Sequence, residues 1–181
     1  MTTHMRNFLM AGGMLLAVAA APVSATAQQK LPPVRVTASV QYADDLALRA
    51  ESLSTQITQF KKAAELFERS ADVRAPGDAR AVTCLRSAAT LRYNSGNKRK
   101  GLGLMEKAAD RAIRLGDVVI AAHSYIDAAV IASELRQGER ALDLSQRAAL
   151  LVKSPLLSDA QRSALLERMS GWSAVRQVAS R

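Results

Sequence analysis

The chain has little of the residue types from which most catalytic and metal sites are built. Its 181 residues include one cysteine and two histidines. A single cysteine excludes an internal disulfide, and a zinc site normally draws on several Cys or His ligands. The sequence also lacks a glycine-rich phosphate loop, a G-x-S-x-G motif and an H-E-x-x-H motif. We therefore predict no metal, no cofactor and no catalytic residues.

Aromatic residues are scarce as well, at 4% of the chain, whereas alanine is abundant. This composition favours helices that pack closely through small side chains. An alternating, strand-like pattern occurs in residues 34–40, but no second strand is available to pair with it. The composition therefore predicts an all-α fold.

The first 27 residues have the pattern of a secretory signal peptide. A short segment with Arg6 and no acid precedes the apolar run Phe8–Ala21, and small residues follow at Ala25 and Ala27. Cleavage is predicted between Ala27 and Gln28. The apolar run is short for a membrane span, although an uncleaved anchor is the competing interpretation.

The predicted address is therefore outside the cytosol, either the bacterial periplasm or the exterior. Met1 and Met5 are both compatible with the true start. Removing residues 1–27 would take one of the 25 basic residues and none of the 16 acids, so the net charge falls from +9 to +8. Outside the cytosol, such a charge favours anionic lipid or polymer surfaces rather than nucleic acid. We expect no membrane span in the processed chain.

Segments that contain proline or glycine divide residues 28–181 into an extended linker and a series of helices. Pro32 and Pro33 argue against a helix in residues 28–41, which we expect to be a linker or a strand added to a partner's sheet. Segments such as Pro76-Gly77-Asp78 and Ser95-Gly96-Asn97 mark turns. Helices are expected at 42–56, 57–73, 79–94, 98–115, 118–136, 139–152 and 159–170, with 171–181 as an extension or tail. The first two could form one long helix, because no Gly or Pro separates them.

Two stretches of the chain repeat each other, residues 85–108 and 125–148. Small residues coincide with small ones and bulky with bulky ones, except that the small Ser145 corresponds to the bulky Met105. The matched positions are Leu85 with Tyr125, Ala88-Ala89 with Ala128-Ala129, Gly101 with Ala141, Met105 with Ser145, and Ala108 with Ala148. A repeat of this length is typical of a solenoid built from helix pairs, in which each pair buries its apolar face against the next.

This pattern resembles the tetratricopeptide repeat (TPR), and a partial earlier copy occurs at Ala63, Phe67 and Ser70. The resemblance covers roughly residues 42–152. It implies antiparallel helical hairpins stacked as a short α-solenoid of six to seven helices over residues 42–170, with a C-terminal capping helix. The chain departs from the family where Arg92 and Ala132 replace the usual aromatic residue, and its period is longer than 34 residues. An alanine-rich bundle with accidental self-similarity is the alternative.

In TPR-like folds the first helix of each pair lines an inner groove. Matched through the repeat, the residues expected to face this groove are Thr83, Arg86, Thr90, Tyr93, Asn94, His123, Ile126, Val130, Ser133 and Glu134. The Lys/Asn/Arg set that grips a terminal carboxylate in some relatives is absent. The resemblance implies a non-catalytic module that binds a segment of a partner protein, or a second copy of itself.

A second hypothesis rests on charge. Four cations share one face of the helix expected at 98–115, and they are Lys100, Lys107, Arg111 and Arg114. This basic stripe could hold the protein on anionic lipid or polymer, but an ordinary solvated helix face has the same pattern.

A third hypothesis is a small hydrolase. Glu65 and Glu68 can share a helix face as an acid/base pair, and Cys84 and His123 occupy nearly equivalent positions of adjacent repeats. Sugar clefts usually carry aromatic platforms, which are few here, and a Cys-His pair needs an orienting third group that the sequence does not supply. Solvated acids and a hydrogen-bonded histidine are the simpler interpretation.

Overall fold

The structure, a computed structural model, describes residues 38–179. The predicted signal peptide, its cleavage site at Ala27 and Gln28, and residues 28–37 of the predicted linker lie outside the described residues. Within the described range the chain forms seven α-helices and no strands. Their bounds are α1 Ala38–Ser54, α2 Phe60–Val73, α3 Arg80–Asn94, α4 Lys98–Arg114, α5 Val118–Glu134, α6 Gly138–Val152 and α7 Asp159–Ala179.

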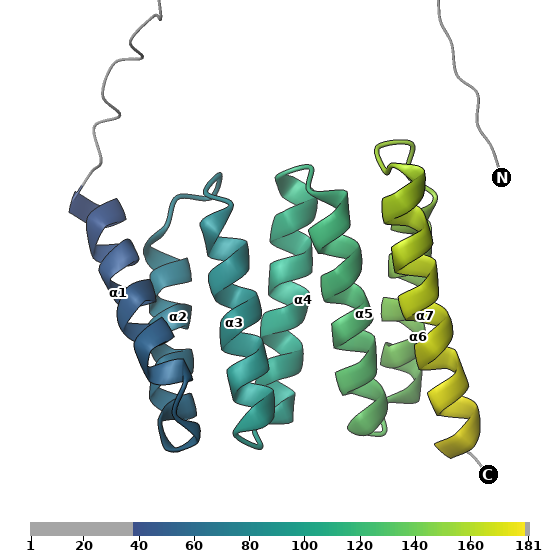
Figure 1. Cartoon of the computed structure of the whole chain (residues 1–181), viewed down its shortest axis with the longest axis horizontal. Coiled ribbons are helices and arrows are strands. Elements are labelled where there is room, and N and C mark those ends of the chain that lie inside the picture. The colour runs from purple at the N-terminus through teal and green to yellow at the C-terminus, as the bar shows by residue number, and fades with distance from the viewer. Residues whose placement is uncertain (1–37, 180–181) are drawn as a thin grey trace, which may run out of the picture. The chain divides into compact units, whose positions relative to one another are not determined.

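The helices stand side by side and alternate in direction, which confirms the all-α prediction of stacked hairpins (Figure 1). From α1 to α6, each helix packs mainly against the next one along the chain, and α7 packs against both α5 and α6. In Figure 1, α1 and α7 lie in front of α2 and α6. The odd-numbered helices therefore share one face of the stack, and the even-numbered helices share the other.

Three boundaries differ from those expected. Helix α1 begins at Ala38, so residues 38–41 are helical rather than extended. A short 3-10 turn, Ile57–Gln59, separates α1 from α2, so the two expected helices are distinct and the alternative of one long helix is wrong. Helix α7 continues to Ala179, so of the two alternatives for the C-terminal residues, an extension or a tail, residues 171–179 form an extension of the last helix.

The turns after α3, α4 and α5 have the same geometry at a spacing of twenty residues. In each, one residue adopts a left-handed backbone conformation: Gly96 (φ 85°), Gly116 (φ 75°) and Arg136 (φ 59°). The next residue's N–H bonds the carbonyl five residues back, as in Asn97 to Arg92, at 2.8 Å. The repeat seen in the sequence at forty residues is therefore a helix-and-turn unit used twice.

The matched positions of the repeat, apart from the half-buried Ser145, lie in the core between the two layers of helices. The alanine pairs at 88–89 and 128–129 are fully buried, and so are Leu85, Ala108 and Ala148. Tyr125 is 3% exposed and donates a hydrogen bond to Asp110 at 2.6 Å. Small residues thus occupy the closest helix contacts, as the repeat predicts.

Two helices start with side-chain caps of the kind that their sequences favour. The side chain of Asp117 accepts the N–H of Ile120 at 2.9 Å. Before α7, the Ser158 hydroxyl accepts the N–H of Gln161, and the Gln161 side chain accepts the N–H of Ser158. Among the described residues, no helix combines the length and the apolar character needed to cross a membrane.

Candidate functional site

The face of the odd-numbered helices carries three adjoining cavities. The first, of about 430 Å³, is lined mainly by α3, α5 and α7. The second, of about 570 Å³, and the third, of about 400 Å³, are lined mainly by α1, α2 and α3. Thr90 lines the first and second, and Phe67 and Thr83 line the second and third. The three cavities therefore form one continuous depression, which we call the groove.

The structure brings most of the predicted inward-facing residues to this groove. The first cavity is lined by Thr90, Tyr93, Ile126 and Val130. The second is lined by Thr83, Arg86, Thr90 and Asn94. His123 and Glu134 contact groove-lining residues, and Ser133 is half-buried on α5. Ile126 is 3% exposed, so it lies at the base of the groove rather than at its edge.

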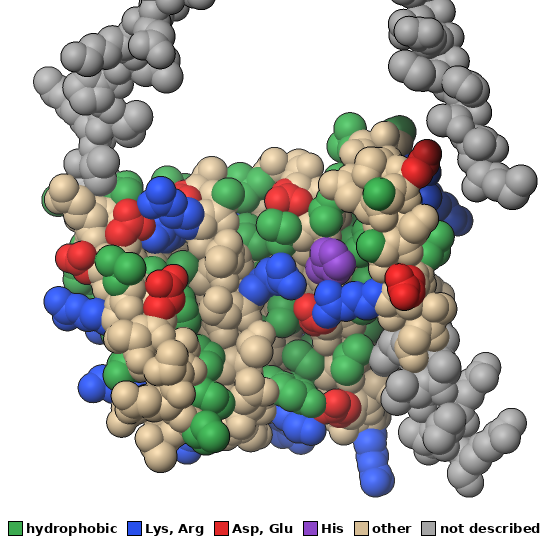
Figure 2. Space-filling view, in the orientation of Figure 1, with side chains coloured by type: hydrophobic (Ala, Val, Ile, Leu, Met, Phe, Trp, Pro, Cys, Tyr) green, Lys and Arg blue, Asp and Glu red, His purple; other side chains and the backbone are tan. Residues whose placement is uncertain are grey.

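Charged side chains meet at the centre of the groove, and we call Arg86, His123, Asp127 and Arg168 the central cluster. One carboxylate oxygen of Asp127 accepts from Arg168 of α7, and the other lies 3.5 Å from a guanidinium nitrogen of Arg86. Arg168 also lies 3.0 Å from Nδ1 of His123. Figure 2 shows a histidine side chain (purple) beside basic side chains (blue) on this face. Two arginines thus share a single carboxylate.

The contact with Arg168 defines the state of His123. A guanidinium has donors and no acceptor, so Nδ1 of His123 must accept and the ring proton resides on Nε2. Burial, together with the positive charges of Arg168 and Arg86, lowers the pKa of His123 below its ordinary value of 6.5, although Asp127 opposes this. His123 is therefore neutral at pH 7 and adds no charge to the central cluster.

A second polar group joins α3 to α5 at the far edge of the first cavity. The Tyr93 hydroxyl donates to Glu134 at 2.8 Å, and the Lys98 ammonium donates to the same carboxylate at 2.8 Å. Burial raises the pKa of Glu134, but the hydrogen bonds from Lys98 and Tyr93 outweigh it and hold the pKa below its usual value. Glu134 is thus occupied by partners within the chain.

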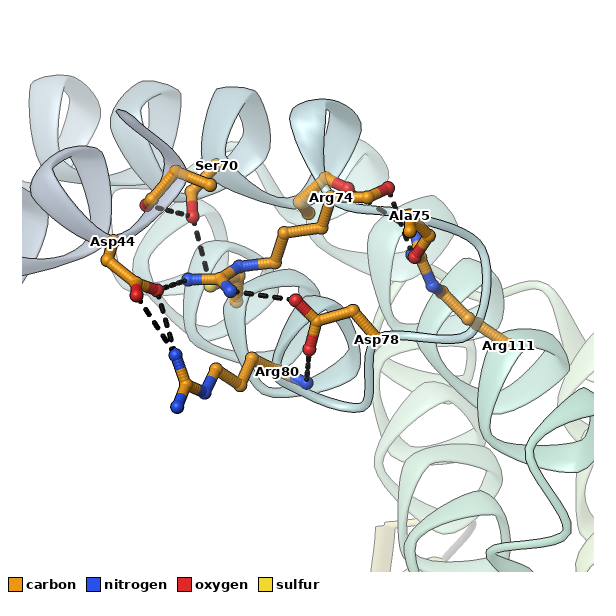
Figure 3. Close-up of polar contacts among 10 residues, drawn as sticks. Asp44, Ser70, Arg74, Ala75, Asp78, Arg80 and Arg111 are labelled. Atoms are coloured by element: carbon orange, nitrogen blue, oxygen red, sulfur yellow. Dashed lines mark hydrogen bonds and ion pairs between the residues drawn. The ribbon is translucent and has the colours of Figure 1, made fainter. Parts of the chain in front are cut away.

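At the other end of the groove, Arg74 ties three helices together (Figure 3). Its side chain is 2% exposed and donates to Asp44 of α1 at 2.5 Å and to Asp78 of the α2–α3 loop at 2.8 Å. Arg80 of α3 reaches the same Asp44 at 3.0 Å. Beside them, Ser70 donates to the carbonyl of Ala43 at 2.7 Å. These contacts fix the walls of the third cavity.

The predicted basic stripe is largely engaged with α2. Lys100 lies 2.7 Å from Glu68, and Lys107 lies 2.9 Å from Asp72. Arg111 donates to backbone carbonyls at the end of α2, those of Ala71, Arg74 and Ala75. Because the free carbonyls of a helix end carry partial negative charge, a cation stabilises them. Three of the four stripe residues therefore stabilise the α2–α4 contact, and Arg114 is exposed.

The two residue pairs considered for hydrolysis have structural partners instead. Glu68 accepts from Nε of Arg92 at 2.8 Å, and Glu65 lies 3.5 Å from the same guanidinium, which is buried. Cys84 is 5% exposed and its sulfur lies 3.5 Å from the Ser70 hydroxyl, whereas His123 contacts Arg168. The described contacts do not join Cys84 to His123.

Sequence reasoning did not identify Arg168 or Asp127 as site residues. Arg168 lies 45 residues after His123, on a helix outside the repeated stretches. The repeat therefore does not indicate whether Arg168 faces the groove. Asp127 belongs to the second repeat, and its counterpart Ser87 lines the second cavity. That equivalence is the one signal in the sequence that could have indicated Asp127.

Within the described part of the chain, no three His, Cys, Asp or Glu residues are placed to hold a metal ion. Comparison with known proteins found no matching family model, no matching curated protein and no matching solved structure.

Proposed function

We propose that this chain is an exported, non-catalytic, TPR-like module that binds a segment of a partner protein in the groove. The observation that carries the proposal is the continuity of the three cavities across α1, α3, α5 and α7. Apolar side chains such as Phe67 and Ile126 lie at the base, and polar side chains such as Thr90 and Arg168 lie beside them. A mixed surface of this kind suits a peptide, because the peptide has both apolar side chains and backbone polar groups.

The stacking of hairpins supports the TPR-like assignment, as do the small residues at the closest helix contacts. The unit of twenty residues per helix and turn is longer than half of the family's 34-residue repeat. We therefore propose a divergent relative of that family. Binding to an anionic surface through the basic stripe is not favoured, because Lys100, Lys107 and Arg111 already have partners on α2.

Export is part of the proposal and has a direct test. If Ala27 and Gln28 flank the cleavage site, the protein recovered from the envelope or the medium should have the intact mass of residues 28–181. The measurement is mass spectrometry of protein produced with its own N-terminal segment in a bacterial host. A mass that includes the apolar run Phe8–Ala21 would support an uncleaved anchor, and recovery in the cytosol would remove export from the proposal.

Binding in the groove is tested by site-specific photo-crosslinking. A photoreactive phenylalanine analogue at Thr90, which is exposed and lines two cavities, should form adducts with a partner protein in the producing cells. These adducts should persist at high salt, since screening weakens charge-driven contacts more than apolar ones. The same probe at Gln146, exposed on α6 in the opposite layer, is the matched control and should give none of these adducts.

A groove-blocking variant makes the crosslinking result specific. Val130→Glu places a charge among the apolar side chains of the first cavity and should abolish the adducts formed from Thr90. Circular dichroism verifies that the variant keeps its helices. Equal adducts from Thr90 and Gln146, or no adducts from Thr90, would contradict the proposed function.

A further inference from the structure

The centre of the groove has more positive than negative charge. Arg86 and Arg168 lie on different helices, and Asp127 is the carboxylate that both approach. His123 is neutral, as argued above. Glu51 lines the second cavity from α1, but no described contact pairs it with either arginine. One guanidinium charge at the centre is therefore left without its own counter-ion.

Arg86 is the arginine with unused hydrogen-bonding capacity. Its described contact to Asp127 is long, at 3.5 Å, and its Nε is buried with no acceptor. A guanidinium has five donors arranged to hold a carboxylate through two parallel hydrogen bonds. The Arg86 side chain is 33% exposed, so its terminal donors are open to the groove although its Nε is not. A second carboxylate there would bind terminal donors that Asp127 does not occupy.

Apolar surface lies on both sides of this charge. On one side, Met105, Ile126, Val130 and Ile131 line the first cavity. On the other side, Phe60, Phe67, Leu91 and Ile120 line the second. The volumes of about 430 and 570 Å³ are each large enough for a bulky side chain. The sequence of surfaces along the groove is therefore apolar, positive, apolar.

We propose that the groove selects an internal segment of a partner protein in which one acidic side chain lies between two large apolar side chains. The acid binds Arg86 and Arg168 beside Asp127, and the two apolar side chains enter the first and second cavities. This inference rests on the proposed function and specifies its ligand. A phosphorylated side chain is a poorer fit, because its second negative charge would be repelled by Asp127.

The position of Glu51 gives the bound segment a direction. Glu51 stands at the α1 side of the second cavity, where a basic residue of the segment would be favoured. The acidic position faces α5 and α7, and a basic position faces α1. Reversing the segment would leave the central acid in place but move the basic residue from Glu51 to the α7 side of the first cavity, towards Arg168, where like charges repel each other.

Fluorescence anisotropy with synthetic peptides and the full protein tests the inference. The probes are labelled peptides in which Leu and Phe flank a central Glu, separated from it by one, two or three alanines on each side, since the extended spacing is about 3.3–3.6 Å per residue. Each has a twin with Gln at the centre. At least one Glu peptide should bind about tenfold more tightly than its Gln twin, because a charge-assisted contact contributes about 1.5 kcal/mol.

Variants of the protein connect this preference to the central cluster. Arg86→Gln should reduce the difference between the Glu and Gln twins to about threefold or less, mainly by weakening the binding of the Glu peptide. Arg86→Lys should keep part of the preference, because lysine retains the positive charge but cannot form two parallel hydrogen bonds to one carboxylate. Arg99→Gln, an exposed arginine at the start of α4, is the control and should change neither affinity.

The outcomes separate this inference from the proposed function. Equal binding of Glu and Gln twins, blocked by Val130→Glu, would overturn the acidic selection and leave groove binding intact. A preference for Glu that survives Arg86→Gln would place the acid elsewhere and also overturn it. If no Glu peptide binds, the inference fails, and crosslinking from Thr90 still decides whether the groove has a protein partner.

Discussion

Arg74→Ala is expected to destabilise the protein by about 3 kcal/mol, because removing one member of a buried charge network costs about 3–5 kcal/mol. The Arg74 side chain is 2% exposed and connects Asp44 of α1 with Asp78 of the α2–α3 loop (Figure 3). Without it, both carboxylates lose their buried donor and a cavity replaces the side chain. Their partial exposure to water keeps the cost near the lower limit. The measurement is urea unfolding followed by circular dichroism.

Arg80→Ala is the matched control for Arg74→Ala. Arg80 binds the same carboxylate, Asp44, at 3.0 Å, but its side chain is 67% exposed. Exposed ion pairs contribute about 0–1 kcal/mol, so this variant should lose less than about 1 kcal/mol. If both variants lose the same stability, burial of Arg74 is not the cause of its effect.

The same network gives the expected dependence on pH. The hydrogen bond from Arg74 lowers the pKa of Asp44 most, against the effect of burial, and Arg80 adds to it. For Asp78, burial raises the pKa, but the hydrogen bond from Arg74 outweighs it. A lowered folded-state pKa stabilises the fold above the unfolded value of about 3.9 and ceases to do so as the pH falls through the folded value. The wild type should therefore lose stability below about pH 4 more steeply than Arg74→Ala.

The helices and their stacking could be predicted from the sequence, because small residues occur at the helix contacts and glycines at the turns. The alanine pair at 88–89 and its counterpart at 128–129 lie at helix contacts, and Gly96 and Gly116 lie in two of the turns. Arg136 occupies the equivalent left-handed position in the third turn. No rule of turn chemistry selects an arginine there, and the signal for this turn in the sequence is the neighbouring Gly138.

Periodicity indicates which residues share a helix face, but not what covers that face. Lys100, Lys107 and Arg111 do share one side of α4, as predicted. Glu68, Asp72 and the end of α2 lie against them, which a pattern within α4 cannot show. The same limit applies to Arg74, whose partners Asp44 and Asp78 lie thirty residues before it and four after it.

The part of the candidate site that lies on the repeated helices, α3 and α5, was predicted from the sequence. Because α3 and α5 are equivalent, the inward positions of one could be transferred to the other, and Thr90, Tyr93, Ile126 and Val130 do line one cavity. Helix α7 has no counterpart in the repeated stretches. Its docking brings Arg168 to Asp127 and His123, and this tertiary contact determines the charge at the centre of the groove.

Gly101→Ala is expected to destabilise the protein although alanine is the better helix former. A Cβ at position 101 would lie 2.9 Å from the carbonyl oxygen of Ala89 and 3.2 Å from the backbone nitrogen of Tyr93. Both atoms belong to the backbone of α3, which cannot move aside as a flexible side chain can. Overpacking of this kind costs about 1–3 kcal/mol, and at this backbone contact it should exceed the gain of about 1 kcal/mol in helix propensity.

Gly103→Ala, in the same helix, isolates the packing effect. Position 103 is exposed, and apart from the adjoining backbone of its own helix no atom lies within 4 Å of a Cβ placed there. This variant should gain about 0.5–1 kcal/mol from propensity alone. Thermal unfolding should therefore move in opposite directions for the two variants, with a difference of about 2 kcal/mol in stability. Stabilisation by both would mean that α3 and α4 tolerate a methyl group between them.

The matched position Ala141, buried at 1% exposure, already carries such a methyl group at the α5–α6 contact. The small residue at this point of each repeat is thus expected to set how closely the two helices of a hairpin approach.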